Sequence, residues 1–317
     1  MRGEFTFRSR TFAFQKKIIM NNSGYTFFFL SGFLFFRSPD FSFVNYKRKM
    51  KNRLHTLLTP YLLWNGTTFV VICLCQQLHP GFNFFLKKQV ADFCWSDYLL
   101  VFWDKQLVTG HPEDPHGPLL LQFWFVQCLM IVQICVPLIW CGLRRVGVLL
   151  LLLSGVVYWL LPNLDIAGFK PEAFFFFIAG AYSQQLPKGC LQDYRLWSLC
   201  CLVTAIVGGF VPSLLMLYSL SFALLLLSVF LKPKVMIPRH LMQKWLSGAS
   251  FFMFAFHIFI AGAMTNIVKT LSINWNNGTA FLVSFAIVAL NVIACLSVYL
   301  ALHHFAPRLC NILVGGR

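Results

Sequence analysis

The sequence has 317 residues, of which 58% are hydrophobic and only 11% are charged, and its mean hydropathy is +0.69. A soluble domain of this length needs a charged surface, so the composition excludes an ordinary soluble protein and indicates that lipid is the solvent. The formal net charge is +16, but the basic residues form short clusters between apolar runs, which favours membrane topology over nucleic-acid binding. No linker divides the chain. We therefore expect one all-α membrane domain, a polytopic bundle of helices.

Nine apolar segments are candidate membrane spans. A helix needs about 20 mostly apolar residues to cross a bilayer, and about 17 to 25 are tolerated. The expected spans are roughly 22–37, 56–77, 118–141, 146–162, 172–186, 196–211, 213–231, 248–270 and 279–305. The connection at 81–117 is the longest, and its aromatic stretch from Phe93 to Trp103 is typical of a segment at the membrane interface. Half of the acids also lie there: Asp92, Asp97, Asp104, Glu113 and Asp114.

The distribution of Lys and Arg predicts the orientation of the chain. One set of loops, at 37–55, 142–146, 187–195, 232–246 and 306–317, holds 16 of the 26 basic residues, and the opposite set holds 5. Positive loops stay on the cytoplasmic side, so we expect a cytoplasmic C-terminus. Nine spans then place the N-terminus outside, although residues 1–21 are basic and contain no signal peptide. Two explanations remove this conflict: the chain is a ten-helix protein that has lost its first helix, or one helix is miscounted.

Polar side chains inside apolar spans are candidate site residues, because their burial in lipid is costly. The candidates are His257, Asn65, Gln122, Gln127, Gln133, Asn291 and the Ser31–Gly32 pair. His257 lies among aromatic residues in the 248–270 span. It has two interpretations: a structural histidine bonded to a neighbouring helix, and a substrate-binding or catalytic group.

A basic cluster precedes the second expected span, with five cations in the seven residues from Lys47 to Arg53. These cations are suited to anionic lipid headgroups, or simply fix the topology. Arginines at the cytoplasmic mouth of a bundle also make a phosphate site, since guanidinium groups pair bidentately with phosphate oxygens. Most cysteines lie inside apolar runs, and we interpret them as small buried hydrophobic residues. No CxxC pair, Walker loop, GxSxG or HExxH motif is present, and no metal site is expected.

Five segments in order resemble the acyltransferase 3 family of integral membrane proteins, which includes sugar O-acetyltransferases of bacterial envelopes. Phe27 to Phe36 looks like its FFxISGYLFF stretch. Arg48 and Arg53, followed by Leu57 to Trp64, resemble its KR…LLxPYLxW segment. The other three are Pro118 to Met130 (PLWFLRDL), Phe174 to Tyr182 (FFxxGxY) and Ser250 to His257 (SFxIYxFH). The resemblance runs from about residue 23 to the C-terminus.

The resemblance implies a ten-helix acyltransferase domain, here over 22–317, in a bacterial inner membrane. Such a protein transfers an acyl group, usually acetyl from cytosolic acetyl-CoA, to a hydroxyl of an envelope carbohydrate or lipid-linked glycan. Membrane lipid is then a partner and nucleic acid is not. The residue roles that it implies are coenzyme binding by Arg48, Arg53 and Tyr61, a site lining of Ser31, Gly32, Trp64, Trp124 and Gln127, and a catalytic position at His257.

Two features depart from the family pattern. The family's presumed base is a histidine in the first helix, whereas residues 1–22 contain neither a histidine nor an apolar span. Gln127 and Cys128 stand where the family commonly has an Arg–Asp pair. Three hypotheses remain: an acyl-CoA-dependent O-acyltransferase, an inactive remnant of one, and a transporter or glycan flippase. The third lacks the internal inverted repeat typical of many transporters.

Overall fold

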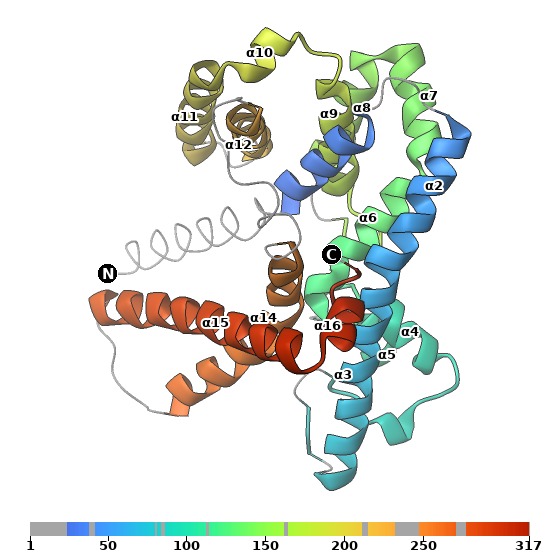
Figure 1. Cartoon of the computed structure of the whole chain (residues 1–317), viewed down its shortest axis with the longest axis vertical. Helices are drawn as coiled ribbons and strands as arrows, with labels where there is room; N and C mark the ends of the chain where they lie inside the picture. The colour runs from blue at the N-terminus through green and yellow to red at the C-terminus, as the bar shows by residue number, and fades with distance from the viewer. Residues whose placement is uncertain are drawn as a thin grey trace. The chain divides into compact units, whose positions relative to one another are not determined.

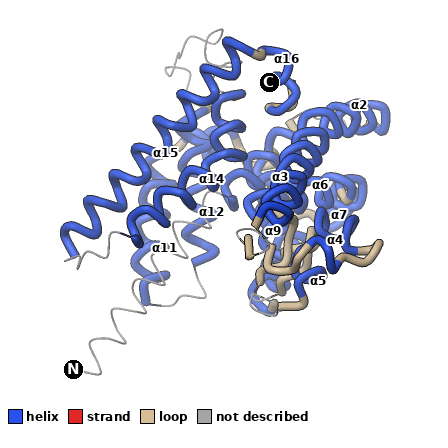
Figure 2. The backbone as a smooth tube through the Cα atoms, turned by 90° about the horizontal axis from the view of Figure 1, so that it is seen from below, coloured by secondary structure: helices blue, strands red, loops and turns tan. Residues whose placement is uncertain are grey.

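The computed structural model describes residues 24–37, 42–79, 81–83, 86–111, 114–161, 164–210, 215–231, 247–270 and 277–316. Helices joined by loops make up this part of the chain (Figure 1; Figure 2). The only β-pairing among the described residues is one isolated bridge between Ile166 and Phe169. The expected all-α class is therefore confirmed.

Every one of the nine apolar segments contains a helix. The helices are Gly24–Phe35, α3 (Thr59–Leu78), α6 (Trp124–Ile134) followed by α7 (Val136–Val146), α8 (Val148–Leu160), α9 (Pro171–Ser183), α11 (Tyr194–Phe210), α12 (Leu215–Phe230), α14 (Ser247–Thr270) and α15 (Asn277–Phe305). Shorter helices are α2 (Phe43–Arg53), α4 (Asp97–Trp103), α5 (Lys105–Thr109), α10 (Lys188–Gln192) and α16 (Pro307–Leu313).

Three helices in the described residues are long and apolar enough to cross a membrane: Phe43–Leu78, Ser247–Val268 and Val283–Phe305. The helices α6 and α7 are bent by 59° at Cys135 and make a fourth span if they are counted together. Pro137 lies in the first turn of α7, a position that proline tolerates but that ends the preceding helix. The chain is therefore a multi-pass membrane protein, and the number of nine spans stays a prediction.

The basic segment before α3 differs from its expected form. We expected a loop over 37–55, but α2, the π-helical turn η1 (Leu54–Leu58) and α3 form one helix of 36 residues. Hydropathy measures the length of a helix that suits lipid, so it does not detect a polar helix that continues beyond the span. Pro60 explains the π-helical turn, because proline has no amide hydrogen and its ring clashes with the carbonyl of the residue four positions earlier, here Thr56.

The chain forms two compact units. Unit 1 contains residues 1–47 and 127–236, and unit 2 contains residues 48–126 and 237–317. Two of the three boundaries fall inside α2 and α6, and the third, between residues 236 and 237, lies outside the described residues. Each unit is described by itself below.

In unit 1 the helix Gly24–Phe35 packs against α9. A Cβ atom on Gly32 would overlap the carbonyl oxygen of Phe177, and one on Gly180 would overlap that of Phe29. Aromatic side chains fill the space around this glycine contact: Phe28, Phe29, Phe176 and Phe177 are all fully buried. The phenylalanine runs at 27–29 and 174–177 thus contribute mainly packing residues.

In unit 2 the residues between α3 and α6 pack along α3 instead of extending away from it (Figure 1). We call residues 86–120 the loop lobe. Its core consists of Ile72 of α3 with Leu86, Val101, Val108 and Leu119. Gln76 accepts a hydrogen bond from the backbone of Val90 at 2.8 Å, and Tyr61 donates its hydroxyl proton to the carbonyl of Phe102. The lobe therefore covers about 22 Å of α3, the length of the 15 residues between these two side chains.

Candidate functional site

The nine site residues expected from the sequence divide between the two units. Unit 2 contains Arg48, Arg53, Tyr61, Trp64, Trp124 and His257, and unit 1 contains Ser31, Gly32 and Gln127. The residues expected to bind the coenzyme and the expected catalytic position thus belong to the same compact unit.

The three residues in unit 1 are mainly packed in helix contacts. Gly32 meets the backbone of α9, and Ser31 beside it is half-buried. The side chain of Gln127, in α6, is 1% exposed. A role of these residues in lining a site stays a prediction.

Polar side chains of α3 hold unit 2 together. Asn65 is fully buried, and its amide nitrogen donates to the carbonyl of Tyr61 at 2.9 Å. Its side-chain oxygen accepts from the backbone of Leu120 at 2.9 Å. The indole of Trp64 donates to the carbonyl of Leu313 at 3.1 Å. Buried polar groups must find partners. The partners found here connect α3 to both the loop lobe and α16.

Aromatic rings connect α3 to α14. The ring centroid of Trp64 lies 5.6 Å from that of Phe252 and 6.1 Å from that of Phe256. Tyr61 meets Phe123 edge to face at 5.8 Å, just before Trp124 begins α6. This packing fixes the first half of α14, where the catalytic position was expected, against α3.

His257 is bonded to its own helix. Its Nδ1 lies 3.1 Å from the carbonyl oxygen of Met253 and 2.8 Å from that of Phe254. A carbonyl only accepts, so Nδ1 carries the proton and Nε2 keeps a lone pair. The neighbouring α15 bonds the backbone instead, since Asn291 donates to the carbonyl of His257 at 3.2 Å. The imidazole is half-buried and has the tautomer that a general base requires.

Gln122, another polar residue identified from the sequence, lies close to this part of α14. Its amide nitrogen donates to the carbonyl of Ala255 at 3.0 Å. Its side-chain oxygen is buried and has no donor among the described residues. An acceptor in this position can receive a hydrogen bond from a bound hydroxyl or amide group.

The basic cluster of α2 presents its cations on more than one face. Arg53 is half-buried and Arg48 is exposed. Five residues separate them, a rotation of about 140° on a helix, whereas Lys49 and Arg53 lie about 40° apart. None of the described carboxylates pairs with Arg53, and α2 contains no acidic residue. Lys49 and Arg53 together therefore suit a bound anion, whereas Arg48 lies on a different face of the helix.

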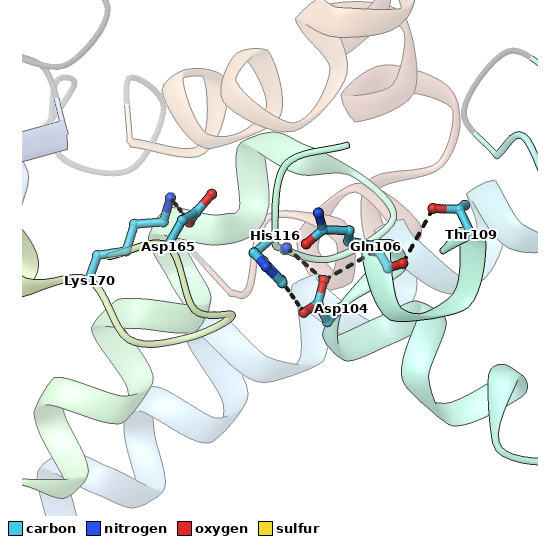
Figure 3. Close-up of polar contacts among 7 residues, drawn as sticks. Asp104, Gln106, Thr109, His116, Asp165 and Lys170 are labelled. Atoms are coloured by element: carbon cyan, nitrogen blue, oxygen red, sulfur yellow. Dashed lines mark hydrogen bonds and ion pairs between the residues drawn. The ribbon is translucent and has the colours of Figure 1, made fainter. Parts of the chain in front are cut away.

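A contact between Asp104 and His116 was missed by sequence reasoning. The Asp104 side chain is 4% exposed, and its Oδ2 lies 2.6 Å from Nδ1 of His116 (Figure 3). Its Oδ1 accepts from the backbone amides of Gln106 at 3.1 Å and Gly117 at 3.3 Å. Asp104 counted only as one acid of a loop, and His116 follows no motif that would have identified it. Its place directly before Gly117 and a predicted span was the one available signal.

Ion pairs fix the rest of the loop lobe. Lys88 contacts Asp97 at 2.6 Å, and its hydrogen bond holds the pKa of the Asp97 carboxyl below its ordinary value. Lys87 contacts Asp114 at 2.9 Å. Burial alone would raise the pKa of Asp114, but hydrogen bonds from Lys87 and Thr109 outweigh it, and the pKa is lowered. The carboxylates of Asp97, Asp104 and Asp114 thus all have their partners within the lobe. Unit 1 has a half-buried pair, Lys170 with Asp165 at 2.7 Å (Figure 3).

Comparison with known proteins identifies the family. An acyltransferase domain model, that of acyltransferase 3, matches residues 18–300. The chain is similar to the succinoglycan biosynthesis protein ExoH of Rhizobium meliloti strain 1021, with 27% identity over 154 residues. That alignment covers 49% of this chain and 38% of the relative. No solved structure matches. The match to the domain model covers most of the chain, and the chain therefore belongs to the acyltransferase 3 family of membrane acyltransferases.

Proposed function

We propose that this chain transfers an acyl group, with acetyl expected, from a cytosolic acyl-CoA to a hydroxyl of an envelope polysaccharide or lipid-linked glycan. The observation that carries the proposal is the acyltransferase domain match over residues 18–300. The similarity to a succinoglycan biosynthesis protein supports a carbohydrate acceptor. A bacterial inner membrane with the C-terminus inside is the corresponding location, since acyl-CoA is made in the cytosol.

The coenzyme phosphates would meet the basic face of α2. Arg53 is half-buried and has no described carboxylate partner, and Lys49 lies on the same face of the helix. Coenzyme A carries a diphosphate and a ribose phosphate, which are the groups that guanidinium binds with two parallel hydrogen bonds. Arg48 would contribute from the exposed side, and Tyr61, two turns further along the helix, would border the path of the coenzyme's flexible arm.

The reaction itself needs a base for the acceptor hydroxyl. His257 fulfils the tautomer requirement through its bonds to the carbonyls of Met253 and Phe254. The orphaned oxygen of Gln122, which contacts α14 at Ala255, offers an acceptor for a second substrate hydroxyl. Both side chains belong to unit 2, as does the basic face of α2.

The test compares two variants of the purified full chain in lipid vesicles, with acetyl-CoA and envelope glycans. Arg53→Ala removes the half-buried guanidinium, and Lys51→Ala removes an exposed cation from the same helix as a matched control. Loss of one charged hydrogen-bonding group weakens binding by about 1.5–3 kcal/mol, or roughly 10- to 150-fold. We expect that increase in the KM for acetyl-CoA for Arg53→Ala and less than about a twofold change for Lys51→Ala.

Two results would contradict the proposal. Coenzyme binding and transfer that are equal in Arg53→Ala and the unaltered chain would remove the phosphate site from α2. Glycan movement across the vesicle membrane without any acyl donor, and without product formation, would favour a flippase.

A further inference from the structure

The Asp104–His116 pair of the loop lobe is not used by the function proposed above. Among the histidines that the structure describes, His116 is the one in contact with a carboxylate. We infer that His116, held in position by Asp104, is a general base for acyl transfer in this chain. This inference rests on the proposed function and assigns the proton transfer from the acceptor hydroxyl to His116 in place of His257.

Hydrogen-bond donors hold the charged carboxylate of Asp104 in place. Its side chain is almost completely buried, and three donors surround the two oxygens: the amides of Gln106 and Gly117, and the imidazole of His116. An ionised carboxylate has acceptor sites only, so each of these contacts is a hydrogen bond toward Asp104. The bond from Gln106 also makes Asp104 the N-cap of α5, so the backbone holds one oxygen of the carboxylate and the other meets His116.

The bond to Asp104 determines which nitrogen of His116 is reactive. Because Nδ1 donates to the carboxylate, Nε2 carries the lone pair. No described residue bonds Nε2, and the His116 side chain is 30% exposed. This is the arrangement by which an aspartate orients a catalytic imidazole and stabilises the imidazolium that forms during proton transfer.

Backbone hydrogen bonds around the pair hold the segment that carries His116 against α4 and α5. The amide of Lys105 donates to the carbonyl of Gly117 at 2.8 Å, and that of Leu119 donates to the carbonyl of Val101 at 3.1 Å. Residues on both sides of Asp104 are thus bonded to residues on the C-terminal side of His116. A rigid frame of this kind reduces the cost of orienting a base.

The pair also lies close to the coenzyme-binding helix in unit 2. Tyr61 bonds the carbonyl of Phe102, two residues before Asp104. Arg53 lies eight residues before Tyr61, about 12 Å along the helix. An acyl-CoA whose phosphates bind at Arg53 can therefore extend its flexible arm along α3 toward the loop lobe.

In the inferred step His116 takes one proton and returns it. Nε2 of His116 takes the proton of the acceptor hydroxyl while the hydroxyl oxygen attacks the carbonyl carbon of the acyl thioester. The carbon–sulfur bond then breaks, and the coenzyme thiolate takes the proton back from Nε2. An alcohol and a thioester give an ester and a free thiol, and Asp104 remains a carboxylate throughout.

The test measures initial rates of the full chain in vesicles with acetyl-CoA and envelope glycan. His116→Gln keeps a donor for Asp104 but has no group that accepts a proton, and His111→Gln makes the same change at an exposed position of the lobe. A general base contributes about 100- to 10,000-fold. We expect kcat to fall at least about 100-fold for His116→Gln, with the KM for acetyl-CoA and the coenzyme affinity unchanged within about twofold. His111→Gln should have the activity of the unaltered chain.

Two further variants distinguish a general base from a purely structural histidine. His116→Ala should regain activity when imidazole is added, which a purely structural histidine would not show. Asp104→Asn should lower kcat and not the affinity for acetyl-CoA, because the amide no longer selects the tautomer with the proton on Nδ1 and the lone pair on Nε2. Normal transfer by His116→Gln, or loss of kcat in His116→Ala without imidazole rescue, would overturn the inference while leaving the proposed function intact. An unaltered chain that binds acetyl-CoA and transfers nothing would overturn both.

Discussion

Gly32 and Gly180 meet backbone to backbone, so that a Cβ atom on either residue would overlap a carbonyl oxygen of the opposite helix. Both glycines belong to motifs that resembled an acyltransferase family, and the contact supplies a packing reason for each. The helix Gly24–Phe35 can approach α9 this closely only where both side chains are absent.

Alanine at Gly32 should therefore destabilise unit 1. Overpacking of a close contact costs about 1–3 kcal/mol, so we expect a lower melting temperature in detergent for Gly32→Ala. Gly189→Ala is the matched control, because a Cβ at Gly189 meets nothing within 4 Å. Equal melting temperatures of the two variants would show that the contact is looser than described.

A second close approach connects the C-terminal segment to η1 and the first turn of α3. Gly315 has φ +73°, and a Cβ there would lie 2.6 Å from the carbonyl oxygen of Thr56. Gly316 has φ +72° with open space around it. Alanine at either position costs about 1–2 kcal/mol for the left-handed backbone. Gly315→Ala should cost clearly more, measured as a lower melting temperature than that of Gly316→Ala; the reverse order would contradict the packing of α16 on α3.

The loop lobe should loosen in acid. Hydrogen bonding to Lys88 lowers the pKa of Asp97 in the folded chain, so the unfolded lobe binds protons more readily. The stability from this pair is present above the unfolded pKa, about 4, and is lost as the pH falls through the folded pKa. The amide protection factors over residues 86–120, which correct for the slower intrinsic exchange in acid, should fall between about pH 5 and pH 3. Asp97→Asn should exchange faster at neutral pH and depend less on pH, whereas Asp92→Asn, at an exposed position, should resemble the unaltered chain.

Hydropathy predicted the helices well, because a run of apolar residues in lipid must satisfy its backbone hydrogen bonds within the segment. All nine apolar segments contain helices, although one is broken before Pro137. The helical character of 43–53 was missed, because this segment is rich in cations and hydropathy does not show that it continues into α3.

The residues of the candidate site were only partly predictable. Family-like motifs located Arg53, Tyr61 and His257, and unit 2 contains all three. Asp104 and His116 meet across 12 positions of chain, a contact that depends on how the loop lobe folds along α3. Neither spacing nor residue type indicates such a non-local contact, which explains why the aspartate appeared only as a loop acid and the histidine was overlooked.

Acyl transfer itself is tested most directly by incubating the purified chain in vesicles with radiolabelled acetyl-CoA and envelope glycan. The account predicts that label enters the glycan in a linkage released by mild alkali, as expected for an ester, and that Arg53→Ala strongly reduces this labelling at limiting acetyl-CoA. Glycan that stays unlabelled, with a folded chain and acetyl-CoA in excess, would contradict it.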